Sequence, residues 1–123
     1  MKFIIQLDSQ LDEIKAKFSD EFKGLKLEFF SKAHNKLEGS PKEDMVTENI
    51  ALSKLNANLE TKEIVIAKEM KVSELEAVFE NDFGLHVQVF RKMGRSWIET
   101  TRTDNYSLAE QMELSADSLK PYS

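Results

Sequence analysis

The sequence has 123 residues, of which 41% are hydrophobic, so we expect one compact domain with a buried core. It contains no cysteine, which excludes disulfides, thiolate nucleophiles and cysteine-based zinc or iron–sulfur sites. The formal net charge of −5, with acids and bases interspersed, is not that of a general nucleic-acid binder. We find neither a signal peptide nor an apolar run near the roughly 18–20 residues of a membrane span, and we expect a cytoplasmic location without membrane contact.

An internal repeat organises the chain into a first unit, residues 1–60, and a second unit, residues 61–123. Residues 10–32 and 71–92 align once Lys23 is removed, and eight of the 22 aligned positions are identical. A period of about 60 residues indicates a duplication rather than a solenoid array. Because a unit of this size would be only marginally stable alone, we expect the two to pack together as one domain.

Each unit is predicted to begin with a strand followed by a helix. Residues 3–7 and 64–67 are short apolar runs rich in β-branched side chains, as in strands covered on both faces. The following apolar residues recur with helical spacing on one face, namely Leu11, Ile14, Phe18 and Phe22 in the first unit and Val72, Leu75, Phe79 and Phe83 in the second.

The predicted helix ends carry recognisable signals. Ser9 with Asp12, and Ser73 with Glu76, are candidate capping pairs at the start. Gly24 and Gly84 follow the last apolar position, and we expect a positive φ at both.

Two strands and a second helix complete each unit. Residues 25–30 and 85–90 alternate between apolar and polar side chains, which is typical of half-buried strands. A short turn is expected to lead to a third strand at Leu37 in the first unit and at Trp97 and Ile98 in the second. The last helix is predicted over residues 50–59 and again from Ser107, where Glu110 would complete a capping box.

The predicted fold class is therefore α+β. It consists of duplicated β-α-β-β-α units with a mixed sheet, or sheets, and helices packed on one face. Whether the strands form one sheet or two is left open by the pattern.

One segment resembles a known type of module. Residues 83–111 read FGLHVQVFRKMGRSWIETTRTDNYSLAEQ, with an FGL after an acidic helix, an alternating strand and a helix that opens with S-L-A-E. This pattern resembles a segment of small, mostly uncharacterised bacterial proteins, several of which look duplicated. The resemblance implies a recurring bacterial module and supplies no active-site residue.

No catalytic, cofactor-binding or metal-binding constellation is recognised. Neither His34 nor His86 is matched by a histidine at the equivalent position of the other unit. Neighbouring carboxylates such as Asp12 and Glu13 do not share a helix face. The chain has no G-x-S-x-G elbow, no P-loop and no G-x-G-x-x-G turn. We therefore expect no cofactor and no enzymatic activity, with a small hydrolase as a third-ranked alternative.

The candidate partner surface consists of two features. The first is an aromatic on the polar face of each alternating strand, Phe30 and Phe90, which is covered either by the chain itself or by a partner. The second is the basic hairpin of the second unit, which combines cations with an aromatic side chain, namely Arg91, Lys92, Arg95, Trp97 and Arg102.

These features favour a non-enzymatic protein-interaction module, such as an adaptor, inhibitor or accessory subunit in a bacterial cytoplasm. Its partner would be another protein or a second copy of the chain. The alternative, from a different functional class, is nucleic-acid binding through the basic hairpin. If the hairpin has no binding function, it is a solvated hairpin tip with a buried tryptophan.

Overall fold

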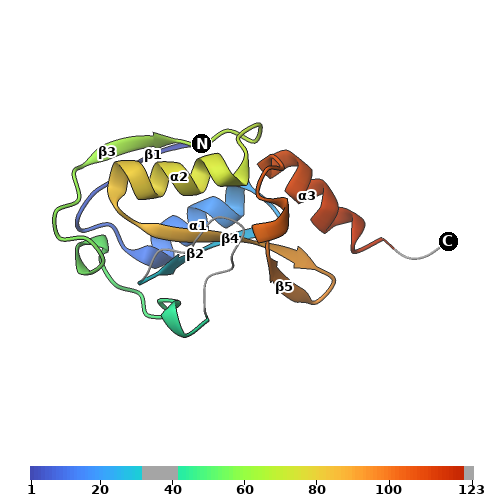
Figure 1. The fold of residues 1–123 in the computed structure, drawn as a ribbon, viewed down its shortest axis with the longest axis horizontal. Coiled ribbons are helices and arrows are strands. Elements are labelled where there is room, and N and C mark those ends of the chain that lie inside the picture. Colours follow the sequence, from blue (N-terminus) through green and yellow to red (C-terminus); the bar gives the residue numbers. More distant parts are fainter. Residues whose placement is uncertain (32–41, 121–123) are drawn as a thin grey trace.

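The computed structural model describes residues 1–31 and 42–120, and its helices and strands confirm the α+β class (Figure 1). The elements in chain order are β1 (Lys2–Ile5), α1 (Leu11–Glu21), β2 (Leu25–Phe30), β3 (Lys62–Val65), α2 (Val72–Phe83), β4 (His86–Met93), β5 (Ser96–Glu99) and α3 (Leu108–Asp117). Short 3-10 turns lie at Lys42–Asp44, Leu52–Lys54 and Thr101–Thr103. The third strand that we expected at Leu37 falls outside the described residues.

The strands form two sheets, and both draw strands from the two halves of the chain. β1 pairs with β3, while β2, β4 and β5 form a second sheet in that order. Every pairing between these strands is antiparallel, so the expectation of a mixed sheet was wrong. The physical reason is that α1 connects strands of different sheets, and so no parallel β-α-β pair forms.

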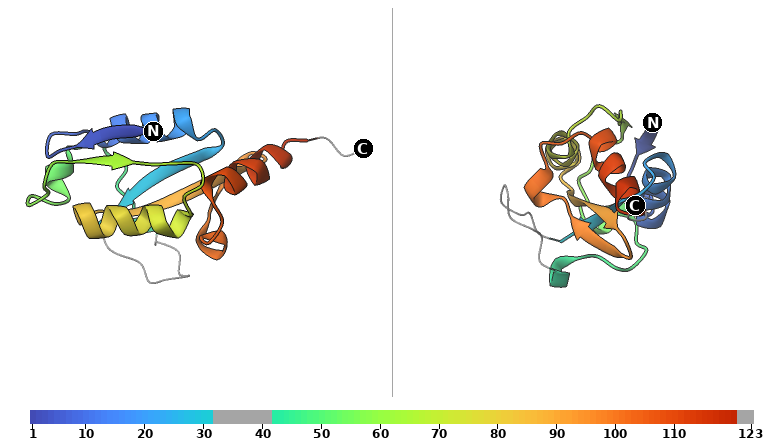
Figure 2. Two further views of the ribbon diagram at one scale, coloured as in Figure 1. Left: turned by 90° about the horizontal axis from the view of Figure 1, so that it is seen from above. Right: turned by 90° about the vertical axis from the view of Figure 1, so that its right-hand side faces the viewer.

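Helices α1 and α2 lie between the two sheets. Figures 1 and 2 show both helices on one side of the β2–β4–β5 sheet, with the two-stranded β1–β3 ribbon across them on the far side. The predicted phenylalanine faces of the helices are buried, and the rings of Phe29 and Phe79 meet edge to face at 6.0 Å. Ile5 and Ile64 reach the same core from the ribbon.

The strand registers relate the two halves by an approximate two-fold axis. Phe3 pairs with Ile64 in the ribbon, and Glu28 pairs with Gln88 at the centre of the larger sheet. In both cases a residue faces the residue that the repeat assigns to it, as happens where a two-fold axis crosses an antiparallel pair. The origin of these halves by duplication stays a prediction.

Backbone hydrogen bonds outside the strands repeat in the same way. The amide of Leu11 donates to Ile50 O at 3.0 Å, and the amide of Val72 donates to Tyr106 O at 3.1 Å. Likewise the amide of Val46 donates to Phe29 O at 2.8 Å, whereas that of Thr100 donates to Val89 O at 3.2 Å. The chain near Val46 is therefore hydrogen-bonded to β2 in the same way that the chain at the end of β5 is hydrogen-bonded to β4.

The predicted helix ends are confirmed in part. Ser107 and Glu110 form the expected capping box, with N···O distances of 3.1 and 3.0 Å. The first helices instead start one residue beyond Gln10 and Lys71, so the capping pairs proposed at Ser9 and Ser73 were wrong.

The helix predicted over residues 50–59 was also wrong, because only the turn Leu52–Lys54 forms. The side chain of Asn56 explains why no helix continues beyond this turn. Its Nδ2 donates to Phe83 O at 2.8 Å, and its Oδ1 accepts from the amide of Asn58 at 3.0 Å. Such side-chain bonds to the backbone compete with helix continuation.

Both expected glycines have positive φ, 85° at Gly24 and 62° at Gly84. Gly84 ends α2, while Gly24 lies in the turn between α1 and β2. A Cβ on Gly24 would overlap the hydroxyl of Ser115 on α3. Gly24 is thus required both by its backbone conformation and by the close approach of α3.

Replacing glycines in this protein should separate those two requirements. Gly94 also has a positive φ, 61°, but an added Cβ would meet nothing within 4 Å. Gly94→Ala should therefore cost about 1–2 kcal/mol of unfolding free energy from backbone strain alone. Gly24→Ala should cost about 1–3 kcal/mol more through overpacking, and adding Ser115→Gly should recover that excess. Equal losses for the two single variants in urea melts would contradict the close approach of α3.

Candidate functional site

The seven residues of the predicted partner surface do not form one surface. Phe30, Phe90 and Arg91 are buried, with 1%, 8% and 7% of their area exposed. Lys92, Arg95, Trp97 and Arg102 are exposed. The structure brings Lys92 and Trp97 together as cross-strand neighbours, and places Arg102 apart from them in a 3-10 turn.

The two aromatic rings are unavailable to a partner, which corrects the idea that they form an exposed surface. Phe90 lies opposite Lys26 across β2 and β4, and the Lys26 Nζ is 5.3 Å from the centre of its ring. Phe30 forms an isolated bridge with Met45, next to β2. Their burial supports the interpretation in which the chain itself covers both rings.

Arg91 holds the last helix against β4. Its Nη1 donates to Gln111 Oε1 on α3 and lies 3.4 Å from Thr103 Oγ1. Gln111 Nε2 in turn donates to Thr103 O at 2.7 Å. Burial lowers the pKa of the Arg91 guanidinium, and Tyr106 acts in the opposite direction. Arg91 thus belongs to a buried polar network that fixes α3, and not to the exposed surface.

An exposed cluster forms instead around Trp97 and consists of Trp97, Lys26 and Lys92. The Lys26 Nζ lies 4.9 Å from the centre of the indole, and the Lys92 Nζ lies 5.7 Å from it. Contacts of this kind are worth about 0.5–1 kcal/mol each at exposed positions. Two lysines from neighbouring strands therefore hold the indole on the sheet face away from the helices.

Sequence reasoning missed Lys26 as part of this cluster. Lys26 lies in the other half of the chain, and it reaches Trp97 only because β2 pairs with β4. No local pattern around Lys26 carries that information. The repeat equates Lys26 with His86, which gives no hint of a contact with Trp97.

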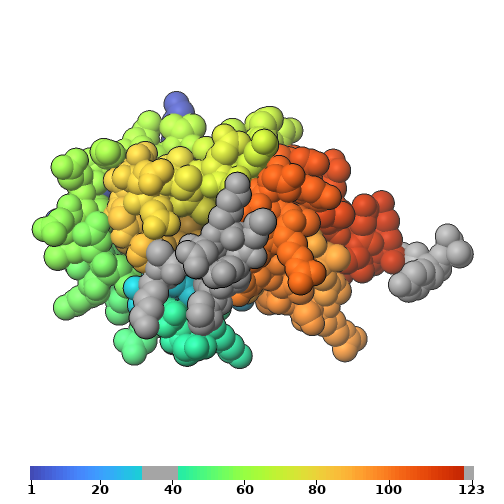
Figure 3. All heavy atoms as spheres, viewed as in Figure 1, coloured from blue at the N-terminus to red at the C-terminus, as the bar shows by residue number. Residues whose placement is uncertain are grey.

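The β5 strand forms an open edge of its sheet. The amide of Lys92 donates to Gly24 O at 2.8 Å, so the Lys92 backbone points toward β2. Because hydrogen-bonded and non-hydrogen-bonded pairs alternate, the backbone of its β5 partner Trp97 points away from β4. In the described part of the chain no strand lies beyond β5, and Figures 1 and 3 show the hairpin projecting from the body.

The open edge exposes apolar surface on both faces of β5 and lies in basic surroundings. Trp97 and Ile98, which point to opposite faces, are each 39% exposed. Because Arg91 is buried and Arg102 lies in a separate turn, the exposed cations of the hairpin are Lys92 and Arg95, and β5 itself carries the acidic Glu99. Three cations, Lys26, Lys92 and Arg95, thus lie around an edge strand whose own charged residue is Glu99.

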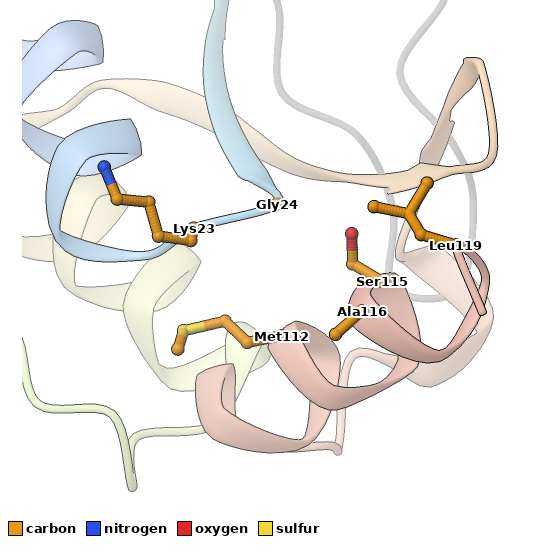
Figure 4. Close-up of a pocket in the computed structure, with 6 residues that line it drawn as sticks. All are labelled: Lys23, Gly24, Met112, Ser115, Ala116 and Leu119. Carbon is orange, nitrogen blue, oxygen red and sulfur yellow. The ribbon is translucent and has the colours of Figure 1, made fainter.

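A second candidate is a pocket of about 290 Å³ between α3 and the turn before β2 (Figure 4). It is lined by Lys23, Gly24, Met112, Ser115, Ala116 and Leu119. Ser115 faces Gly24, while the ammonium group of Lys23 is turned away. The walls are mostly apolar and present no converging set of polar groups, so the pocket shows no arrangement for bond-making chemistry.

The described residues show no other constellation for chemistry. Within residues 1–31 and 42–120, no group of three or more histidine or acidic side chains is placed to hold a metal ion. His86 Nδ1 lies 3.5 Å from Glu80 Oε1, and His34 is outside the described residues. Nor does this part of the chain contain a helix with the length and apolar character that crossing a membrane demands.

Comparison with known proteins found no matching protein-family model, no matching curated protein and no matching solved structure.

The different roles of Arg91 and Arg95 are testable, although only four positions separate them. Arg91→Met would leave Gln111 Oε1 buried without its donor, which should cost about 1–3 kcal/mol of unfolding free energy. Arg95→Met on the exposed turn should stay within about 0.5 kcal/mol of the parent. Chemical denaturation of both variants measures the difference. Similar losses would show that Arg91 is not an anchor for α3.

Proposed function

We propose that this chain is a non-enzymatic protein-interaction module whose docking surface is the Trp97 cluster together with the open edge of β5. The observation that carries the proposal is the exposure of Trp97 and Ile98 on opposite faces of β5, an edge strand whose outer side is open. A partner can contact both side chains and the backbone between them at once.

The chemistry of the cluster fits protein recognition. Tryptophan is among the residues that contribute most to binding when a partner covers them, and arginine often surrounds such sites. Lys26 and Lys92 hold the indole in place before a partner arrives, which reduces the entropy lost on binding. The exposed Arg95 extends the surface at the hairpin turn.

The biological setting is part of the same proposal. A role as an adaptor, inhibitor or accessory subunit suits a docking surface without a reaction centre. The resemblance of residues 83–111 to a recurring bacterial module supports a bacterial origin. The lack of cysteine in the sequence suits a reducing cytoplasm.

Nucleic-acid binding is the second candidate, because Lys92, Arg95 and Arg102 are exposed near an aromatic side chain. Three observations rank it lower. Arg91 is buried, the chain carries a net charge of −5, and two lysines already lie over the indole on which a base would stack.

Photocrosslinking tests the proposed docking surface. We expect p-benzoylphenylalanine at position 97 to form a covalent adduct with a discrete protein in cells of the source organism. The same probe at Ala16 or Ala77, which are exposed on α1 and α2, should not form it. With that protein purified, Trp97→Ala should weaken binding about 30-fold, the equivalent of about 2 kcal/mol for a central tryptophan.

Two results would contradict the proposal. One is a set of adducts that is the same from position 97 and from the two helix positions. The other is a nucleic-acid adduct at position 97 together with mobility shifts that weaken steeply as salt is raised, since phosphate contacts have that dependence.

A further inference from the structure

We infer that the partner enters this site as an extended, acidic segment that pairs with β5 as an additional strand. This inference rests on the proposed function and specifies the conformation and the charge of the partner. It follows from the direction of the backbone groups, from the state of the other strand edges and from the charges that surround β5.

The backbone of β5 is placed to accept another strand. The amide and carbonyl of Trp97 point away from β4, whereas Ile98 on the next position pairs with Arg91. A segment laid along this edge would form hydrogen bonds at Trp97 and continue the sheet. Strand addition of this kind gives affinity through the main chain and specificity through alternate side chains.

The other edges are less suited to this partner. Beyond β2, the amide of Val46 donates to Phe29 O and that of Ser31 donates to Asp44 O at 2.9 Å, so that edge is already paired at its end. The β1–β3 ribbon also has open edges; it exposes Ile4 and Val65 and carries charges of both signs at Lys2, Lys62 and Glu63, without an indole held by two lysines. The β5 edge is a regular strand that carries Glu99 and has the cations Lys92 and Arg95 beside it.

The charges specify the side chains of the incoming segment. Its residues would alternate between the two faces of the extended sheet. On the face of Trp97 their direct neighbours on β5 are Trp97 and Glu99. The ammonium groups of Lys92 and Lys26 lie at the indole and Arg95 lies near the turn, so acidic residues fit beside Trp97 and the turn. On the other face they meet Ile98, so apolar residues fit there. The expected partner segment therefore alternates acidic and apolar residues.

The same features have a competing interpretation, which the experiment must separate. Charged residues on a short edge strand also prevent unwanted pairing between copies of a protein. If protection is their only role, no extended segment will pair with β5, whatever its charge.

The test uses the full chain and a capped nine-residue peptide of alternating Glu and Val as the probe. One control peptide has Lys in place of Glu. A second control keeps every side chain but carries N-methyl groups on the alternate amides that would face β5. Affinity is measured by NMR titration, and amide hydrogen exchange is measured for Trp97 and for Ile98. Because Ile98 pairs with β4 in the free protein, its amide is the internal control.

We expect the Glu–Val peptide to bind, to slow exchange at Trp97 and to leave Ile98 unchanged. N-methylation should abolish binding, and the Lys–Val peptide should bind at least about tenfold more weakly. Lys92→Gln and Arg95→Gln should each weaken binding about two- to fivefold, as expected for exposed ion pairs. Ala77→Gln on α2 is the matched surface control and should have no effect.

Equal binding by the N-methylated peptide would overturn strand pairing, and equal binding by the Lys–Val peptide would overturn the charge preference. Absence of binding by the Glu–Val peptide would overturn the inference in favour of edge protection. Preferential binding of a thymidine oligonucleotide, with no change at Trp97, would overturn it in favour of nucleic acid. The proposed docking surface fails separately, through the crosslinking result at position 97.

Discussion

The antiparallel pairing of β2 with β4 is the interaction on which the rest of this structure depends. It joins one strand from each half of the chain over six residue pairs, from Leu25 with Arg91 to Phe30 with His86. The pairing makes one continuous apolar surface on which α1 and α2 pack. Neither half alone could bury its helix on this sheet, because β2 and β4 each contribute only part of the apolar surface.

The candidate site is a consequence of the same pairing. Lys26 reaches Trp97 from the other half of the chain, and β5 remains at the edge because β4 uses its second side to bind β2. At the far end of the hairpin, α3 is fixed by Arg91 through Gln111 and approaches Gly24 closely through Ser115. The exposed strand edge is thus held on a rigid support, which is what a docking surface needs.

Local sequence patterns predicted the elements better than their arrangement. The spacing of Phe18 and Phe79 on their helices, the capping box at Ser107 and the positive φ of Gly24 all depend on neighbours within a few residues. The exchange of strands between the halves depends on contacts about 60 residues apart, which periodicity does not encode. For the same reason the burial of Arg91 was not foreseen, since it is Gln111 on α3, 20 residues away, that receives its hydrogen bond.

NMR distances between strands test the central claim most directly. Leu27 and Val89 face each other as a non-hydrogen-bonded pair, in which the Cα atoms are about 4.5 Å apart and the α-hydrogens point toward one another. The structure therefore predicts a strong Hα–Hα nuclear Overhauser effect between Leu27 and Val89 in the dilute protein, and a second between Phe29 and Val87. Absence of both effects, with the Hα of Leu27 contacting a strand of its own half instead, would show that the two halves fold side by side and do not share a sheet.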